Sequence, residues 1–251
     1  MIATRRTQRR VLPHRLFITD YRNFILGLQP GNMVACWPMW ENSGATTVED
    51  IGGGGYDGTP ANVTFDVTKF NGRPAPSFNG TNSVIALPVA GLDTPFNGAQ
   101  LTLLIWFKVA AGIWTDASLD FAVEFGTAAS DRFSLNIPAA ANTFEWRYQA
   151  GGVTEIVTRS GESSTDWNMA AITVDKANDT MRGYWNGVQE GITKTGLGVW
   201  AGALDNLWTA IGDLRNTGAV APWNGNLAYC TVWNAPLSAQ KILQAYTSAV
   251  V

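Results

Sequence analysis

Residues 166–191 read DWNMAAITVDKANDTMRGYWNGVQEG, and this stretch decides the fold of the chain. Apolar side chains alternate along 169–174, the polar segment DKAND then turns the chain, and residues 181–185 return. Asn186 and Gly187 form a second turn, and this dipeptide is typical of two-residue turns in which both residues need positive φ. The stretch therefore predicts three short antiparallel strands in a meander.

Outward from this meander, short apolar segments bounded by glycine, proline, asparagine or aspartate recur along the chain. Gly151 and Gly152 supply another two-residue hairpin signal. Ser238 stands as an N-cap before apolar residues at helical spacing, which predicts one short helix over 238–246. The predicted strands outside the meander are 33–39, 75–78, 82–87, 100–110, 121–125, 133–137, 144–150, 153–158, 208–212 and 227–233. This spacing predicts an all-β fold, a two-sheet antiparallel sandwich.

The composition fits one large β domain, which we expect over 33–251. Of the 251 residues, 46% are hydrophobic and only 15% are charged, against about 25% in ordinary soluble domains. The 11 tryptophans and 26 glycines indicate large flat side chains and many turns. No apolar run approaches the ~20 residues that span a bilayer, so we expect a protein that is soluble or held by partners.

Residues 1–32 form an N-terminal extension whose charge differs from that of the domain. Residues 1–22 carry six arginines against the single Asp20, so this segment is about +5 and the remainder about −8 within a net charge of −3. We do not expect a secretory signal, because 24–28 is too short for its apolar core and charged residues interrupt the apolar stretch. The extension is therefore predicted to stay attached.

We interpret 1–32 as a basic and apolar arm that docks on a protein assembly, where arginine forks pair with carboxylates and apolar side chains fill grooves. Nucleic acid is the competing partner, but no aromatic side chains are interleaved among residues 1–16 to stack on bases. On this interpretation, deleting residues 1–30 leaves a folded monomer. The predicted docking residues are Arg5, Arg6, Arg9, Arg10, Leu12, Leu16, Phe17, Phe24 and Ile25.

Several catalytic classes lack their residues in this chain. The one histidine, His14, lies in the arm, so the domain has no base for serine or cysteine triads and no histidine to ligate a metal. The four glycines at 52–55 precede no GK[ST] motif, so we interpret them as a surface turn rather than a nucleotide site. We expect no cofactor.

Asp120 and Glu124 are the residues to weigh for glycoside hydrolysis. They are four apart, facing the same way on a strand and roughly 13 Å apart, whereas a retaining pair needs about 5 to 5.5 Å. Ala122 stands where a closer carboxylate would be required. We therefore interpret Asp120 and Glu124 as solvent-facing charges and predict that the protein is not an enzyme.

Tryptophan is the residue type most suited to stacking on a sugar ring. Trp37, Trp106, Trp185 and Trp233 fall inside predicted strands, which indicates burial in the core. Tryptophans near turns or strand ends are the candidates for sugar contact, because side chains are more often exposed there. Burial under a loop is the alternative interpretation of these tryptophans. These candidates are Trp114, Trp200, Trp208 and Trp223.

The two cysteines, Cys36 and Cys230, fall on the first and last predicted strands. These strands often neighbour each other in a sandwich, so a disulfide is one interpretation. The other, which the apolar surroundings favour, is two buried thiols.

The succession of motifs resembles the laminin-G-like domains of the concanavalin A-like lectin/glucanase superfamily. The matching pieces, in order from about Met33 to Val250, are MVACWPMWENSG, DIGGGGYDGT, PSFNGTNSVIALP, LTLLIWFKV, DWNMAAITVDKANDTMRGYWNG, AIGD and WNGNLAYCTVWNAPLSAQKI. The resemblance implies a jelly-roll sandwich of a kind often used to bind carbohydrate or protein. The arm lies outside it.

The chain departs from the family at positions where acidic residues often stand, namely Asn79, Asn186 and Ala228-Tyr229. This weakens a calcium site, since calcium takes six to eight oxygen ligands. Asp50 and Asp57 keep the acidic character and are the weak calcium candidates that the resemblance leaves.

Two functions follow as expectations. The first is a non-enzymatic structural or adhesion protein, a phage virion decoration or appendage anchored by its arm, because similar domains recur on phage particles; its partners are then virion subunits and further copies of itself. The alternative is a lectin-like carbohydrate-binding module that recognises cell-surface glycans, in which case the location is extracellular or at the cell surface. Neither function predicts a nucleic-acid or membrane partner.

Overall fold

The meander predicted from residues 166–191 forms three strands, β11 (Asn168–Asp175), β12 (Thr180–Trp185) and β13 (Val188–Lys194). Their antiparallel register pairs Ala170 with Trp185, and the turn residue Asn186 has a φ of 49°. On the other side, β11 pairs with β6 (Gln100–Val109) over its whole length. The predicted antiparallel meander is confirmed, and the structure places it in the larger sheet.

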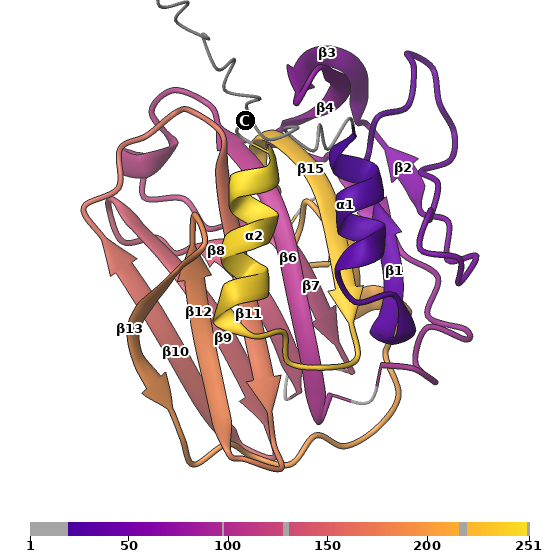
Figure 1. Ribbon diagram of the computed structural model, residues 1–251. Coiled ribbons are helices and arrows are strands. Elements are labelled where there is room, and N and C mark those ends of the chain that lie inside the picture. The colour runs from indigo at the N-terminus through magenta and orange to yellow at the C-terminus, as the bar shows by residue number, and fades with distance from the viewer. Residues whose placement is uncertain (1–19, 97, 128–130, 216–219, 250–251) are drawn as a thin grey trace, which may run out of the picture.

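The computed structural model describes residues 20–96, 98–127, 131–215 and 220–249. These residues form two antiparallel sheets packed face to face, with two helices on the outside of the larger sheet (Figure 1). The larger sheet has the order β13-β12-β11-β6-β15-β4-β3, with β1 paired to β15. Its other strands are β1 (Met33–Trp37), β3 (Thr64–Phe70), β4 (Arg73–Asn79) and β15 (Asn224–Trp233).

The smaller sheet has seven strands in the order β10-β9-β8-β7-β14-β5-β2. They are β2 (Thr59–Ala61), β5 (Val84–Ala86), β7 (Asp120–Gly126), β8 (Arg132–Ile137), β9 (Thr143–Ala150), β10 (Val153–Ser160) and β14 (Thr209–Ile211). Three short 3-10 helices complete the described elements: η1 (Pro30–Asn32), η2 (Ile113–Thr115) and η3 (Asn206–Trp208). The predicted all-β sandwich is confirmed.

The inner faces of the two sheets enclose an aromatic core. Phe107 of the larger sheet stacks on Phe144 of the smaller one with ring centroids 5.1 Å apart, and Trp185 meets both rings edge-on. Trp37 and Trp146 are fully buried in the same cluster. Each such side chain removed from water stabilises the fold by roughly 1.5–3 kcal/mol before ordering costs, so this core is the main source of stability.

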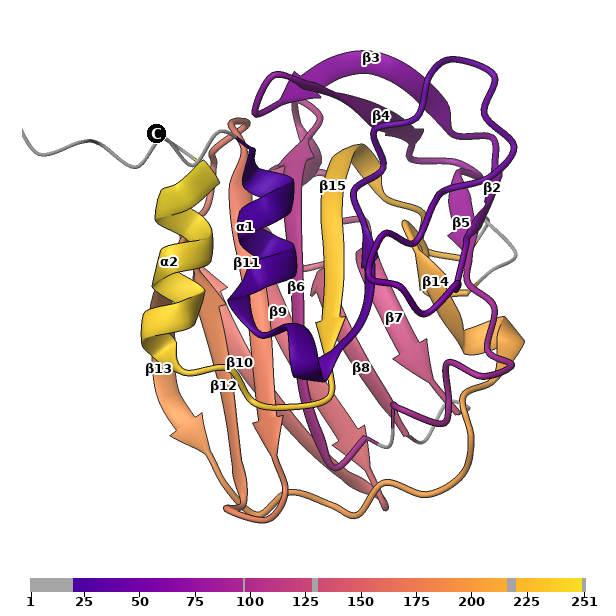
Figure 2. The same cartoon turned by 45° about the vertical axis from the view of Figure 1, so that its right-hand side comes forward.

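A second apolar layer lies between the larger sheet and the helices α1 (Tyr21–Leu28) and α2 (Ala239–Ala249) (Figure 2). Asp20 caps α1 by accepting from the Arg22 amide at 3.1 Å. Tyr21 and Ile25, one helical turn apart, are buried against the sheet. α2 adds Ile242 to the same layer. The fold thus has three layers rather than two.

The position of α1 corrects the predicted boundary between arm and domain. Ile25 is fully buried and Phe24 is partly buried against the second layer, so both pack within this chain. The other predicted docking residues, Arg5, Arg6, Arg9, Arg10, Leu12, Leu16 and Phe17, lie outside the described residues. The apolar residues of 21–28 are thus explained by packing within the chain. None of the described helices is long and apolar enough to cross a membrane.

The first and last strands are neighbours, since β1 pairs with β15 and Cys36 lies opposite Thr231. Cys36 nevertheless points into the layer beneath the helices, while Cys230 belongs to the core between the sheets. Because the two thiols lie on opposite faces of one sheet, they cannot bond, and both are free. Of the two interpretations of the cysteines, the structure shows the buried thiols.

Both thiols are expected to be inert in the folded protein. Burial raises the pKa of Cys36 to about 12 and also raises the pKa of Cys230, so little reactive thiolate forms. With a thiol-specific chromogenic reagent at pH 8, we expect no reaction of the native protein and release from both cysteines after unfolding in guanidinium. Rapid labelling of either thiol in the native state would contradict this placement.

Candidate functional site

β7 carries the two carboxylates that the sequence assigned to solvent, and the structure corrects that assignment. Asp120 is 3% exposed and Glu124 is fully buried. The register with β8 shifts between Phe121 and Val123, so one extra residue forms a β-bulge. The bulge changes the alternation along the strand: Asp120 pairs with the core residue Ile137, whereas Glu124 pairs with Ser134. The two carboxylates therefore lie on opposite sides of the sheet.

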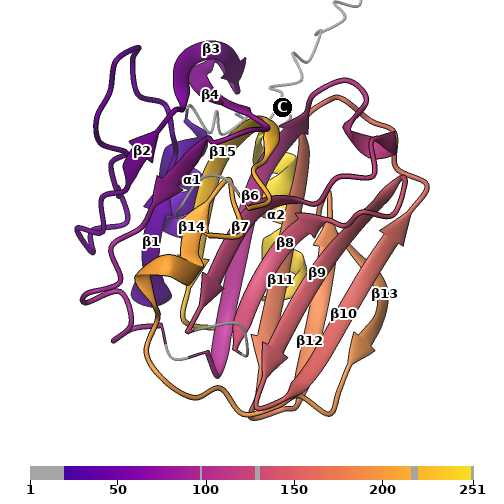
Figure 3. The same cartoon turned by 180° about the vertical axis from the view of Figure 1, so that it is seen from behind.

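Glu124 belongs to a group of polar side chains on the outward side of β7, β8 and β9. The residues that alternate with them, including Phe133, Leu135 and Trp146, fill the core, which fixes the direction of the polar set. This side of the sheet faces away from both α-helices (Figure 3). We call it the outer polar face, and its members are Glu124, Arg132, Ser134, Asn136, Glu145, Arg147 and Gln149.

Short contacts organise most of this face. Arg132 Nε donates to Gln149 Oε1 at 3.3 Å, and Arg147 Nη2 lies 3.2 Å from Glu145 Oε2. The Ser134 hydroxyl donates to Asn136 Oδ1, also at 3.3 Å. The first contact joins β8 to β9 and each of the other two lies within one strand, so polar side chains of β8 and β9 are held in place.

Glu124 is the exception at the centre of the face. Its two carboxyl oxygens accept no hydrogen bond within the described residues, and Arg132 Nη1 is 3.9 Å away, too far to donate. Arg147 Nε is also buried without a partner among the described residues. Buried polar atoms are nearly always hydrogen-bonded in proteins, and each that is not costs about 1–3 kcal/mol. A ligand, an ion or an ordered water is the usual partner of such an atom.

Burial also changes the protonation of Glu124. Desolvation raises the pKa of this carboxyl well above its usual value, against the opposing effects of Arg132, Arg147 and the nearby Ser134 hydroxyl. Glu124 therefore stays protonated at pH values where an exposed glutamate is ionised. At the other end of β7, burial raises the pKa of Asp120 to about 7, with a smaller contribution from Asp116.

This protonation gives a pH dependence that can be measured. Because the folded-state pKa of Glu124 lies above the unfolded value, its stabilising contribution is complete below the unfolded pKa and is lost as pH rises through the folded pKa. Glutamine cannot ionise. We measure the free energy of unfolding in urea at pH 5 and pH 9 and subtract the wild-type value from that of Glu124→Gln. We expect this difference to be larger at pH 9, and a smaller difference at pH 9 would contradict the buried neutral carboxyl.

Trp208 lies at the edge of the outer polar face, directly before β14. A β-carbon at Gly126 would sit 3.2 Å from the Trp208 β-carbon and 3.3 Å from that of Arg132, so the indole and Arg132 flank this glycine. Trp208 is half-buried, and the guanidinium of Arg215 lies 4.2 Å from its ring centroid. Of the four tryptophan candidates, this one borders the face.

The other tryptophan candidates lie elsewhere. Trp114 is 4% exposed and donates its indole hydrogen to Ser164 O, and Trp223 is fully buried edge-on against Phe107, so both have the buried placement that was the alternative interpretation. The reason is that η2 and the start of β15 fold inward over the end of the core. Trp200 is partly buried and stacks on the core ring of Phe133 at 4.8 Å.

The calcium candidates organise a loop. Asp50 accepts the amides of Cys36 and Gly52 on one carboxyl oxygen and that of Tyr56 on the other, and Asp57 accepts the Asp50 amide. Their oxygens are therefore largely engaged by backbone donors at the glycine-rich turn. Across the part of the chain that the structure describes, no group of three or more His, Cys, Asp or Glu side chains could hold a metal ion.

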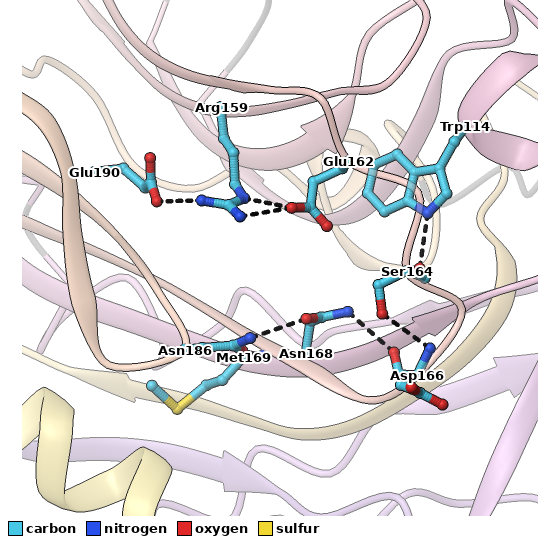
Figure 4. Close-up of polar contacts among 9 residues, drawn as sticks. All are labelled: Trp114, Arg159, Glu162, Ser164, Asp166, Asn168, Met169, Asn186 and Glu190. Carbon is cyan, nitrogen blue, oxygen red and sulfur yellow. Dashed lines mark hydrogen bonds and ion pairs between the residues drawn. The ribbon is translucent and has the colours of Figure 1, made fainter.

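Arg159 centres a second polar cluster, where the edges of the two sheets meet (Figure 4). It pairs with Glu162 at 2.6 Å and with Glu190 of β13 at 2.5 Å, and its guanidinium lies 5.0 Å from the ring centroid of Trp185. Arg159 comes from β10 in the smaller sheet and Glu190 from the larger, so the cluster ties the sheets together. Its three charged side chains pair with one another inside the protein, which indicates a structural role.

A rim pocket of about 640 Å³ is the other location to consider. Its lining includes Trp40, Glu41 and Arg73. The guanidinium groups of Arg22 and Arg73 lie 5.8 and 5.2 Å from the Trp40 ring centroid, and Arg73 also pairs with Asp20 at 3.3 Å. Glu41 Oε2 in this lining is buried without a partner among the described residues. The outer polar face has three such atoms, both carboxyl oxygens of Glu124 and Nε of Arg147, which makes it the stronger candidate.

Comparison with solved structures gives the same sandwich. The receptor-binding domain of botulinum neurotoxin C/D mosaic serotype is 12% identical with a TM-score of 0.69, over 88% of this chain and 52% of that one. Domain 4 of a GH43 extracellular arabinanase from Geobacillus stearothermophilus, in complex with arabinotriose, is 17% identical with a TM-score of 0.61, over 86% and 98%. The sialidase of Trypanosoma rangeli, in complex with sialic acid, is 15% identical with a TM-score of 0.64, over 87% and 33%.

These identities establish the shared fold alone, and the chain spans about half the length of the neurotoxin domain. A search of curated proteins finds no match. The sequence itself matches the family model of the concanavalin A-like lectin/glucanases superfamily over residues 79–243, more than half of the chain. The laminin-G-like motifs, the jelly-roll sandwich and this match lead to one conclusion: the chain belongs to the concanavalin A-like lectin/glucanase superfamily.

Proposed function

We propose that the protein is a non-enzymatic carbohydrate-binding module and that sugar binds at the outer polar face. The observation that carries this proposal is the set of buried, unpartnered polar atoms on Glu124 and Arg147, on a side of the sheet that faces away from both α-helices. Sugar hydroxyls both donate and accept hydrogen bonds, so they match a face that mixes the two. Trp208 at its edge supplies a flat apolar surface.

A hydrolytic role has less support. Glycosidases place two carboxyl groups on either side of the scissile bond. Here the bulge in β7 sends Asp120 and Glu124 to opposite sides of the sheet, so the pair cannot flank one substrate. The fold also occurs in the neurotoxin receptor-binding domain and in the arabinanase domain that holds arabinotriose, which supports a binding role.

The test is a glycan array followed by calorimetric titration of the best ligand. Arg147→Met keeps an unbranched apolar side chain and removes the guanidinium donors, and a hydrogen bond to a charged group is worth about 1.5–3 kcal/mol. We expect this change to weaken binding by about 10- to 100-fold. Trp40→Ala in the rim pocket is the matched control and should leave the affinity unchanged. The opposite ranking would move the site to the rim, and an array without binders would remove the proposal.

A place on a phage virion stays a prediction, because the basic residues on which it depends lie outside the described residues. The charge difference between residues 1–22 and the remainder motivates it. A carbohydrate-binding module carried on a virion would combine both predicted functions. Sedimentation of purified particles, with identification of this chain among the virion proteins, decides the question; absence of the chain from every particle fraction would dismiss it.

A further inference from the structure

The outer polar face is rich in arginine on a protein whose net charge is −3. Arg132 and Arg147 project from β8 and β9, and Arg215 lies over Trp208 at the edge. Of these three arginines, Arg147 pairs closely with an acidic side chain, Glu145. A cationic patch on an acidic protein indicates an anionic ligand.

We propose that the ligand of this face is a carboxylated sugar, whose carboxylate is held by the Arg132 and Arg147 guanidinium groups beside the buried Glu124 side chain. This inference rests on the proposed carbohydrate-binding function and specifies its ligand class. The planar guanidinium matches a carboxylate with two parallel hydrogen bonds, which explains a preference for this anion. Arg147 Nε has no partner in the described residues, and the Arg147 side chain is 24% exposed, so this guanidinium can donate to a bound carboxylate.

Glu124 decides whether the arginines are free to bind. The groups that face it are Arg132 and Ser134 from β8 and Arg147 from β9, while β14 contributes the uncharged Ala210. Arg132 is 3.9 Å from the carboxyl, beyond hydrogen-bond distance, so Glu124 does not neutralise it through a close pair. A protonated Glu124 leaves both guanidinium groups without an internal counter-ion on that side. An external carboxylate can then take that place.

The same arrangement makes binding depend on pH. When pH rises through the raised pKa of Glu124, the ionised side chain attracts Arg132 and Arg147 and repels a ligand carboxylate. Glu145, the other acidic member of the face, pairs with Arg147 Nη2 at 3.2 Å. Binding should therefore be strongest below the pKa of Glu124, while the sugar carboxylate is still ionised. Glu124 is thus a positioning residue rather than a direct ligand.

Two pairs of probes test the ligand class by calorimetry on the full chain at pH 5.5. The first pair is 3′-sialyllactose and its methyl ester, and the second is trigalacturonate and its methyl ester, so each pair differs in the carboxylate. We expect the charged member of at least one pair to bind at least 10-fold more tightly than the neutral member. The pair that shows this difference identifies the kind of sugar acid. Equal binding of charged and neutral members at this face would overturn the inference while leaving the proposed function intact; no binding in either pair would overturn the inference too.

Three variants locate the effect. Arg147→Met should abolish the preference for the charged probe, whereas Arg182→Met, on the other sheet, should keep it. Glu124→Gln should show the same affinity for the charged probe at pH 5.5 and at pH 8.5, whereas the wild-type affinity should fall at least 5-fold between these two pH values. The same loss in Glu124→Gln, or no loss in wild type, would overturn the role of Glu124. Matching melting temperatures for the variants show that a lost preference does not come from unfolding.

Discussion

Replacing Tyr21 with alanine is expected to lower the free energy of unfolding by about 3–5 kcal/mol, the range for removing a large aromatic side chain from a core. Tyr21 is 1% exposed, and its ring meets that of Tyr229 edge-on with centroids 4.8 Å apart. Its hydroxyl accepts from Trp106 Nε1 at 2.8 Å. The substitution therefore opens a cavity beneath α1 and leaves a buried indole donor without a partner.

Tyr21→Phe is the matched control, because it keeps the ring and removes only the hydroxyl. We expect it to cost about 1–3 kcal/mol for the unpaired Trp106 donor. Urea unfolding followed by tryptophan fluorescence measures both variants. If Tyr21→Ala cost less than 1 kcal/mol, α1 would be a loosely attached arm. Deletion of residues 1–30, which the arm interpretation regards as harmless, should destabilise the domain severely, since it removes the helix that covers Trp106.

Replacing Arg159 with methionine is expected to have the next largest effect on stability. Arg159 pairs with Glu162 and Glu190, and the side chains are 29%, 9% and 23% exposed. Removing one partner of a fully buried ion pair costs about 3–5 kcal/mol, and the partial exposure here reduces the expected loss to about 1–3 kcal/mol. Because Glu190 lies on β13 and Arg159 on β10, the loss should loosen the contact between the sheet edges.

The control for Arg159 neutralises the two carboxylates it would leave behind. In the triple variant Arg159→Met, Glu162→Gln, Glu190→Gln, no unpaired charge remains, so most of the lost stability should return. Urea unfolding at pH 7 gives the comparison. A triple variant that is less stable than Arg159→Met alone would show that the cluster acts through packing on Trp185 rather than through charge.

The sequence predicts the strands that form the inner faces because their side chains alternate and their ends are marked by turn residues. The meander of β11 to β13 and the hairpin of β9 and β10 are both confirmed. β2 and β3 escape prediction: β2 is three residues with Pro60 in the middle, and β3 is mostly polar and exposed on an edge. α1 escapes because eight residues in a basic segment give little local signal, and its partner is the distant face of a sheet.

The candidate site could be predicted only in part. Trp208 is singled out by its place near a turn, and it does border the outer polar face. The sequence singles out Glu124 by its carboxyl group but predicts that it faces solvent. The bulge at Phe121 to Val123 depends on pairing with β8, so the sequence of β7 alone does not reveal it. Arg132 and Arg147 look like ordinary exposed strand residues. Their importance appears only when the register brings them beside the buried carboxyl.

The central claim, that sugar binds at the outer polar face, is tested most directly by amide chemical-shift mapping of the ¹⁵N-labelled, deuterated protein. The ligand is the oligosaccharide that binds best on the array, added to saturation. We expect the largest shifts at Glu124, Arg132 and Arg147 and at the indole of Trp208, with Trp40 and Arg73 of the rim pocket unchanged. Shifts gathered at the rim pocket, with the outer polar face silent, would contradict the account.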